Sequence, residues 1–284
     1  EAKKQLNTTT VKDKAQQLHA PGREKTVIQI LSHVFRKLDH DWLSDRKNGK
    51  DGSCAILTLL HGVNIETLQL YIANLGDSRG VMCRGGAAVA LSEDHKPNRP
   101  DEVERVKRNG GKVAKVVKTW RVMDSDPKKR AAMLAVSRAF GDRDFKKPKK
   151  IVSSVPEVHV VPVSPVDLFA VIACDGIWDV LGNQEVVDIV ADHWGSPQAA
   201  TDAVKRKALE LGSTDDLTVL VVMFAWQERH ASKILSNWRR KHKHSFAHEK
   251  NTGVFESEVE VGAMSATESD GASAKIAANM RYTE

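Results

Sequence analysis

The strongest constraint on the fold lies in residues 53–91, where short apolar runs alternate with turns that contain glycine. The runs occupy residues 54–60, 67–73, 80–84 and 87–91, and the joins include NLGDS and RGG. Runs of this length between turn residues predict β-strands. Because a parallel crossover needs about a dozen residues, joins this short predict an antiparallel meander.

Helical periodicity flanks these runs. Residues 27–42 place a set of apolar side chains on one predicted face: Ile28, Leu31, Phe35, Leu38 and Trp42. Residues 100–109 predict a charged amphipathic helix that stops at two glycines, and residues 183–194 and 197–211 predict two more helices. Apolar runs at 169–174 and 218–224 predict strands buried on both faces. Strands covered by helices predict a layered α+β domain.

Composition excludes several other protein classes. Hydrophobic residues make up 41% of the 284 residues and charged residues 28%, which is typical of a globular chain. The apolar runs are far shorter than the roughly 18 residues that a membrane span needs. Three scattered cysteines, Cys54, Cys83 and Cys174, fit neither a disulfide framework nor a zinc motif. We therefore expect free thiols in a reducing compartment, the cytoplasm or the nucleus.

Changes in composition along the chain predict four segments. Residues 1–26 form a polar N-terminal segment, and residues 27–225 form the folded domain. Residues 226–250 carry seven Lys and Arg against two Glu and predict a basic extension. Residues 251–284 are acidic and rich in Ser, Ala, Gly and Thr, which predicts a disordered tail.

The formal net charge of +6 is concentrated in a few basic runs, among them residues 146–150 and 239–244. Such runs could serve nuclear import or an acidic partner, although basic runs are also common on solvated surfaces. Lys128, Lys129 and Arg130 could contact a phosphoprotein, or lie in a solvated loop. Aromatic residues are not interleaved with the basic runs as stacking on bases would need, so no nucleic acid is expected.

Aspartates follow or precede several predicted strands. Asp175 and Asp179 follow the run at 169–174, Asp215 and Asp216 precede the run at 218–224, and Asp94 follows the run at 87–91. Carboxylates at strand ends are suitable ligands for hard divalent cations, and paired Mg²⁺ or Mn²⁺ ions can activate water for phosphoryl transfer. Single strand-end aspartates also cap helices and close turns. Each of them taken alone is therefore ambiguous.

The motifs considered together are more specific. In order along the chain they are GDSRG (76–80), LSEDHKP (91–97), LAVSRAFGD (134–142), CDGIWDV (174–180) and STDDLTV (213–219). This series resembles the metal-dependent protein phosphatases of the PPM or type 2C family, over about residues 27–224. The resemblance implies a four-layer αββα sandwich with two central antiparallel sheets. It also implies a serine/threonine phosphatase that acts on phosphorylated proteins by direct attack of a metal-activated water, without a phosphoenzyme.

The resemblance also implies roles for particular residues. Asp175 and Asp215 look like ligands of two catalytic Mn²⁺ or Mg²⁺ ions, and Asp94 with Asp179 looks like the pair that holds a third, weaker ion. Three further residues look structural at their turns: Asp77, Arg79 and Asp142. A monomer is the family default.

Two departures from the family pattern bear on the metal site. The family has Asn after the last ligand, whereas this chain has Asp216, which could be a further ligand or could displace Asp215. The Asp-Gly-His-Gly-Gly motif, which supplies the bridging carboxylate and the general-acid histidine, is absent from residues 1–284. The phosphate-binding arginine is absent as well. By family spacing these residues belong shortly before Glu1, so we expect the fold to be incomplete at its N-terminal end.

Two hypotheses follow from these departures. In the first, the chain is a fragment of an active phosphatase, which Glu1 in place of Met and the retained aspartates favour. In the second, it is a catalytically inactive phosphatase-like module that binds a partner. Neither the phosphoprotein substrate nor the role of the C-terminal segments can be predicted from the sequence.

Overall fold

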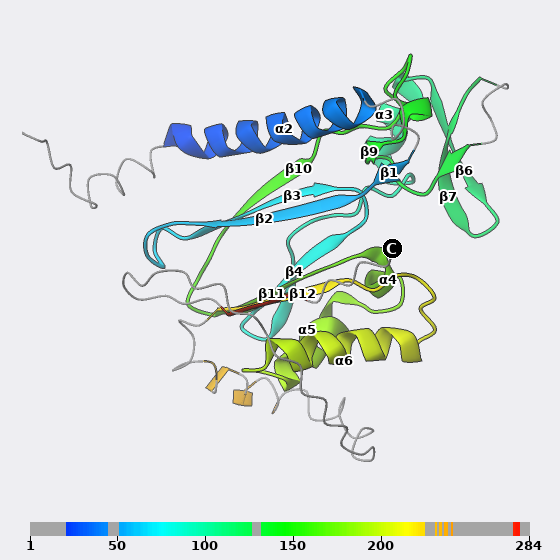
Figure 1. Ribbon diagram of the computed structural model, residues 1–284. Coiled ribbons are helices and arrows are strands. Elements are labelled where there is room, and N and C mark those ends of the chain that lie inside the picture. The colour runs from blue at the N-terminus through cyan, green and yellow to red at the C-terminus, as the bar shows by residue number, and fades with distance from the viewer. Residues whose placement is uncertain are drawn as a thin grey trace, which may run out of the picture.

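A computed structural model describes residues 21–44, 51–126, 132–224 and separate positions between 231 and 240, together with the backbone of 275–278. Figure 1 shows four stacked layers: one helix, a first sheet, a second sheet and a pair of helices. The predicted α+β sandwich with two central antiparallel sheets is therefore confirmed. Within the described residues, no helix combines the length and apolar character needed to cross a bilayer.

The first sheet has three antiparallel strands. In spatial order they are β10 (Glu157–Pro162), β3 (Gln69–Leu75) and β2 (Ala55–His61). Both neighbours pair with β3 in register, with Glu157 opposite Asn74 and Ala55 opposite Leu75. The central strand is almost fully buried, because it has a partner on each side and a packed layer on each face.

The second sheet has five antiparallel strands. Their order is β13 (Lys275–Ala278), β12 (Val219–Met223), β11 (Asp167–Ala173), β4 (Arg79–Arg84) and β5 (Ala87–Ala90). Strand β11 lies in the middle and all seven of its residues are buried. Strand β13 comes from the tail that was expected to be disordered and pairs with β12 through residues 275–278.

The two sheets pack face to face through apolar side chains. Leu70 and Ile72 of the first sheet meet Met82 and Ala170 of the second, and Phe224 closes the same cluster. Burial of these side chains is the main force that holds the sheets together.

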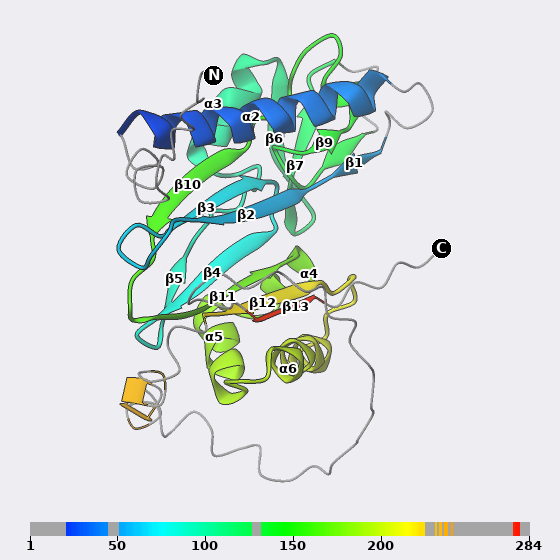
Figure 2. The ribbon, with the colours of Figure 1, turned by 60° about the vertical axis from the view of Figure 1, so that its left-hand side comes forward.

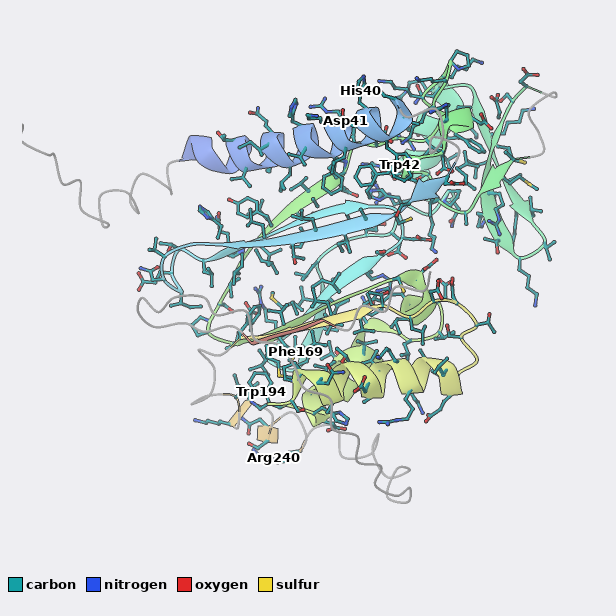
Figure 3. The ribbon with its side chains drawn as sticks, in the orientation of Figure 1. His40, Asp41, Trp42, Phe169, Trp194 and Arg240 are labelled. Carbon is teal, nitrogen blue, oxygen red and sulfur yellow. The ribbon has the colours of Figure 1, made fainter. Side chains whose placement is uncertain are left out.

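Helices cover the outer faces of both sheets. On the first sheet, α2 (Pro21–Ser44) packs Leu31 and Phe35 against the buried β3. On the second, α5 (Asn183–Asp192) and α6 (Pro197–Glu210) form the last layer, which Figure 2 shows below β11 and β12. Trp194, just after α5, packs its ring 6.3 Å from that of Phe169 (Figure 3).

The predicted apolar face of α2 is only partly correct. Leu31 and Phe35 are buried, but Leu38 is 53% exposed and Trp42 44% exposed. The third buried residue of the face is instead Asp39, whose carboxylate accepts a hydrogen bond from the amide of Gly141. The buried face of α2 therefore contains every fourth residue: Leu31, Phe35 and Asp39. Leu38 and Trp42 lie on the neighbouring face, which no described element covers fully.

The predicted meander is wrong at one join. Strands β2 and β3 pair, and so do β4 and β5, but β3 and β4 belong to different sheets. The chain changes sheets at residues 76–78, where Gly76 has φ +107° and a Cβ would lie 2.2 Å from the Cys54 sulfur. A glycine is needed there for both reasons. The change of sheets places Asp77 at the end of the sandwich.

A smaller unit lies beside the sandwich. It contains α3 (Pro100–Arg108), the hairpin of β6 (Gly111–Val116) and β7 (Thr119–Asp124), and the short β8 (Met133–Leu134). Val106, Val122 and Ile151 form its core. Nearby, β1 (Gly52–Ser53) pairs with β9 (Phe140–Gly141), which the 3-10 helix Arg143–Phe145 follows. Sequence patterns predicted α3 but neither the hairpin nor β10.

Candidate active site

The predicted ligands Asp175 and Asp215 lie together at one end of the second sheet. Strand β11 ends at Ala173, and the four-residue helix α4 (Asp175–Trp178) begins at Asp175 itself. A Cβ on Gly176 would lie 2.5 Å from the carbonyl oxygen of Asp216 and 3.3 Å from the Cβ of Asp215. Only a glycine permits this approach, so Gly176 brings the two carboxylate-bearing loops into contact.

Hydrogen bonds fix the two loops to each other. The Ser213 hydroxyl donates to the carbonyl of Gly176 at 2.7 Å, and the Cys174 thiol donates to the carbonyl of Asp216 at 3.0 Å. The amide of Cys174 donates to the carbonyl of Thr218 at 3.2 Å. The backbone of the Asp175–Asp215 site is therefore defined before any ligand binds.

Several carboxylates crowd around Asp175. Burial raises the pKa of Asp175, and the negative charges of Asp77 and Asp215 raise this pKa further. Asp179 adds to the repulsion, whereas Lys96 opposes it. Among the described residues, it is the adjacent amide of Gly176 that donates a hydrogen bond to the Asp175 carboxylate, at 3.1 Å. A site with this excess of negative charge favours a bound cation.

The predicted accessory pair has a different environment. The Arg79 guanidinium donates two hydrogen bonds to the carboxylate of Asp94, at 2.9 and 2.8 Å. It also donates to the Asn183 side chain at 2.8 Å and lies 5.3 Å from the centre of the Trp178 ring. The hydrogen bonds to Asp94 raise the pKa of Arg79, and the negative charges of Asp179 and Asp77 add to the shift. Asp94 is therefore already neutralised by a cation of the protein.

Lys96 provides the second cation. Its ammonium donates to Asp77 at 2.6 Å and lies 3.6 Å from a carboxylate oxygen of Asp179. Asp77 also accepts a hydrogen bond from the Cys54 thiol at 3.3 Å. Asp77 and Arg79, interpreted from the sequence as turn residues, thus contact the acidic site directly.

Lys96 and Asp77 were missed as members of the site. Asp77 ends an apolar run in the same way as Asp175, and that shared position was the available signal. Lys96 lies within the LSEDHKP motif, but its partners Asp77 and Asp179 follow β3 and α4, so no local pattern joins the three residues.

The donor chemistry suits a hard cation, but the described ligand set is partial. All the carboxylates are oxygen donors, which Mn²⁺ and Mg²⁺ prefer. Within residues 21–44, 51–126 and 132–224, however, no three His, Cys, Asp or Glu residues are grouped closely enough to hold a metal ion. The described side chains therefore supply only part of a coordination shell.

Comparison with known proteins identifies one family. The family model described as "Protein phosphatase 2C" matches residues 2–217, which extends upstream of the expected domain start at residue 27. Over 202 residues the chain is 42% identical to "Probable protein phosphatase 2C 59" from Oryza sativa subsp. japonica, covering 70% of this chain and 56% of that protein. Over 196 residues it is 40% identical to "Probable protein phosphatase 2C 7" from the same plant, covering 68% and 47%.

A solved structure supports the fold. The serine-threonine phosphatase 2C from Toxoplasma gondii superposes with a TM-score of 0.58 at 22% identity, covering 75% of this chain and 82% of that one. The chain spans about half the length of the curated relatives it matches.

Proposed function

Because the chain belongs to the protein phosphatase 2C family, we propose that it is the catalytic region of a metal-dependent protein phosphatase. The substrates would be phosphoserine and phosphothreonine in proteins. The observation that carries this proposal is the contact between the Asp175 and Asp215 loops through Gly176. It places two carboxylates together at a point where the pKa of Asp175 is raised by neighbouring negative charge.

Asp175 and Asp215 are the residues that would hold the catalytic metal pair. Bound Mn²⁺ or Mg²⁺ would activate water and neutralise charge on a phosphoryl group. The Asp216 amide donates to the Asp215 carboxylate at 2.8 Å, which orients Asp215 and leaves the Asp216 carboxylate as an added donor. Mutual repulsion between unpaired carboxylates is relieved when a cation binds.

Asp94 and Asp179 would hold an accessory ion more weakly. Each carboxylate faces a basic side chain, Arg79 for Asp94 and Lys96 for Asp179. A cation at this pair must compete with these side chains, whereas Asp175 and Asp215 have no ion pair among the described residues. This difference supports a strong and a weak metal position in one acidic site.

The second candidate is a phosphatase-like module that binds a partner without catalysis. The lack of any group of three metal-binding side chains among the described residues favours it. The sequence motif that would supply a bridging carboxylate is also absent from residues 1–284.

Metal titration distinguishes the two candidates. We would titrate Mn²⁺ calorimetrically into this chain and into the full gene product, and assay both with p-nitrophenyl phosphate. A phosphatase predicts Mn²⁺-dependent turnover by the full product, abolished by Asp175→Asn and retained by the control Asp202→Asn on α6. If neither protein bound metal or showed turnover, the result would support the non-catalytic binding module instead.

A further inference from the structure

The hairpin of β6 and β7 is strongly basic. From residue 109 to residue 123 the chain contains no acidic residue and four basic ones: Lys112, Lys115, Lys118 and Arg121. None of their four side chains makes an ion pair or hydrogen bond with any residue that the structure describes. The hairpin therefore presents uncompensated positive charge, in contrast to the paired Arg79 and Lys96.

The hairpin is anchored at its base and free at its tip. Val113 and Val122 are opposite each other and pack on the cluster around Val106. Gly111 starts β6 where a Cβ would lie 2.5 Å from Ile151, so the base fits closely against the core of the smaller unit. At the tip Val117 is 92% exposed with φ +56°, a conformation that a β-branched residue rarely adopts.

An exposed aromatic residue lies among the basic ones. Trp120 is 39% exposed and pairs across the hairpin with Lys115. A tryptophan at such a position offers a large, rigid contact area to a partner. Tryptophan is enriched at protein interfaces, and surrounding positive charge steers a partner of the opposite charge.

The hairpin lies at the same end of the molecule as the acidic site. Figure 1 shows the hairpin projecting past the sandwich at the end where α4 lies. A protein segment whose phosphorylated residue reached Asp175 would thus extend toward the basic hairpin.

We propose that the β6–β7 hairpin binds an acidic segment next to the phosphorylated residue of the substrate. This inference rests on the proposed phosphatase function and adds the substrate class to it, phosphoproteins with Asp or Glu beside the phosphosite. The carboxylates would meet Lys115 and Lys118 beside Trp120, on which an apolar side chain would pack, and Lys112 on the opposite face of β6 would add to the positive charge of the hairpin. Lysines on an edge strand also discourage aggregation, a role that requires no acidic ligand.

Peptide binding to the full chain tests the proposal. Fluorescence anisotropy in EDTA, which prevents turnover, would compare a phosphoserine peptide flanked by Glu with the same peptide flanked by Gln. The test variant is Lys112→Gln/Lys115→Gln/Lys118→Gln. The matched control removes the same charge from α6 through Lys205→Gln/Arg206→Gln/Lys207→Gln.

We expect the test variant to weaken binding of the Glu-flanked peptide about tenfold at low salt. Binding of the Gln-flanked peptide should not change, and the control should behave as wild type. Added salt should remove the advantage of the Glu-flanked peptide, because exposed charges are screened.

Three results would overturn the proposal. The test variant could bind both peptides as wild type does, or the control could lose as much affinity as the test variant. A single-stranded oligothymidine could also bind more tightly than the Glu-flanked peptide and be lost in the test variant, which would assign the hairpin to nucleic acid. Phosphate release with Mn²⁺ from the full gene product is measured separately, so failure of the phosphatase function is seen independently of hairpin binding.

Discussion

Two acidic residues of this protein, Glu102 and Asp175, have opposite environments. Glu102 of α3 is 1% exposed, and its carboxylate accepts hydrogen bonds from Arg105, Arg138 and the Ser137 hydroxyl. Burial alone would raise the pKa of this carboxyl, but the two guanidinium groups outweigh burial and hold the pKa well below its usual value. Glu102 is therefore a buried charge that the protein itself compensates.

Asp175 lacks such compensation. Its nearest charges are mostly carboxylates, and its pKa is raised by burial and by repulsion. The same functional group thus serves stability or function, depending on whether the fold supplies the counter-charge. The ion pair of Glu102 with Arg138 connects α3 to the segment between β8 and β10. At Asp175 a bound ligand would have to supply the positive charge.

Replacement of Glu102 should have the largest effect on stability. In Glu102→Gln the two arginines lose their buried counter-charge, which costs about 3–5 kcal/mol of unfolding free energy. Urea unfolding measures this loss. Glu104→Gln, an exposed neighbour on the same helix, should change the unfolding free energy by less than about 0.5 kcal/mol. A similar small change in both variants would contradict the structural role of Glu102.

Asp175→Asn should affect metal binding strongly and stability only slightly. We expect the Mn²⁺ affinity of the full gene product to fall about 100-fold or more, since a ligand is lost. The unfolding free energy of the metal-free chain should stay constant or rise by about 1 kcal/mol, because repulsion is relieved. Calorimetric Mn²⁺ titration and urea unfolding of the same samples test both parts. If Asp175→Asn destabilised the chain as much as Glu102→Gln, the contrast between the two residues would be lost.

Asp142 is intermediate between Glu102 and Asp175. Burial raises the pKa of Asp142 to about 6; Lys146 opposes the shift, and Asp39 and Asp51 add to it. Because the folded protein binds this proton more tightly than the unfolded chain does, stability falls as pH rises from about 4 through 6.

Asp142→Asn should therefore stabilise the protein at pH 8 by about 1–2 kcal/mol and have little effect at pH 4. Asn tolerates the φ of +50° found at this position as well as Asp does. Urea unfolding of both proteins across this pH range is the measurement. Equal stability of wild type and variant at every pH would disprove the assignment.

Lys96→Gln should have the smallest effect. Removing this ammonium leaves Asp77 and Asp179 without their cation, so Mn²⁺ affinity should rise about two- to fivefold. The expected change is small because the Lys96 side chain is 35% exposed and solvent screens its charge. Lys107→Gln on α3 is the control that should leave Mn²⁺ affinity unaltered. Reduced Mn²⁺ affinity in Lys96→Gln would show that Lys96 supports the site instead of competing in it.

The amino-acid sequence was sufficient to predict the elements whose signal is local. The helices α5 and α6 and the strands β11 and β12 lie within a few residues of their predicted positions, because periodicity and turn residues act over short distances. The strand-end aspartates were recognised as a possible metal site for the same reason. The five sequence motifs also indicated the phosphatase family to which the chain belongs.

How these elements meet could not be predicted from local signals. The change of sheets at Gly76, the β6–β7 hairpin and the pairing of Arg79 with Asn183, 104 residues apart, depend on packing between distant segments. The opposite environments of Glu102 and Asp175 depend on it as well. A carboxylate has the same chemistry wherever it occurs in a sequence, but its pKa and its role are set by the charges and the burial that the fold brings to it.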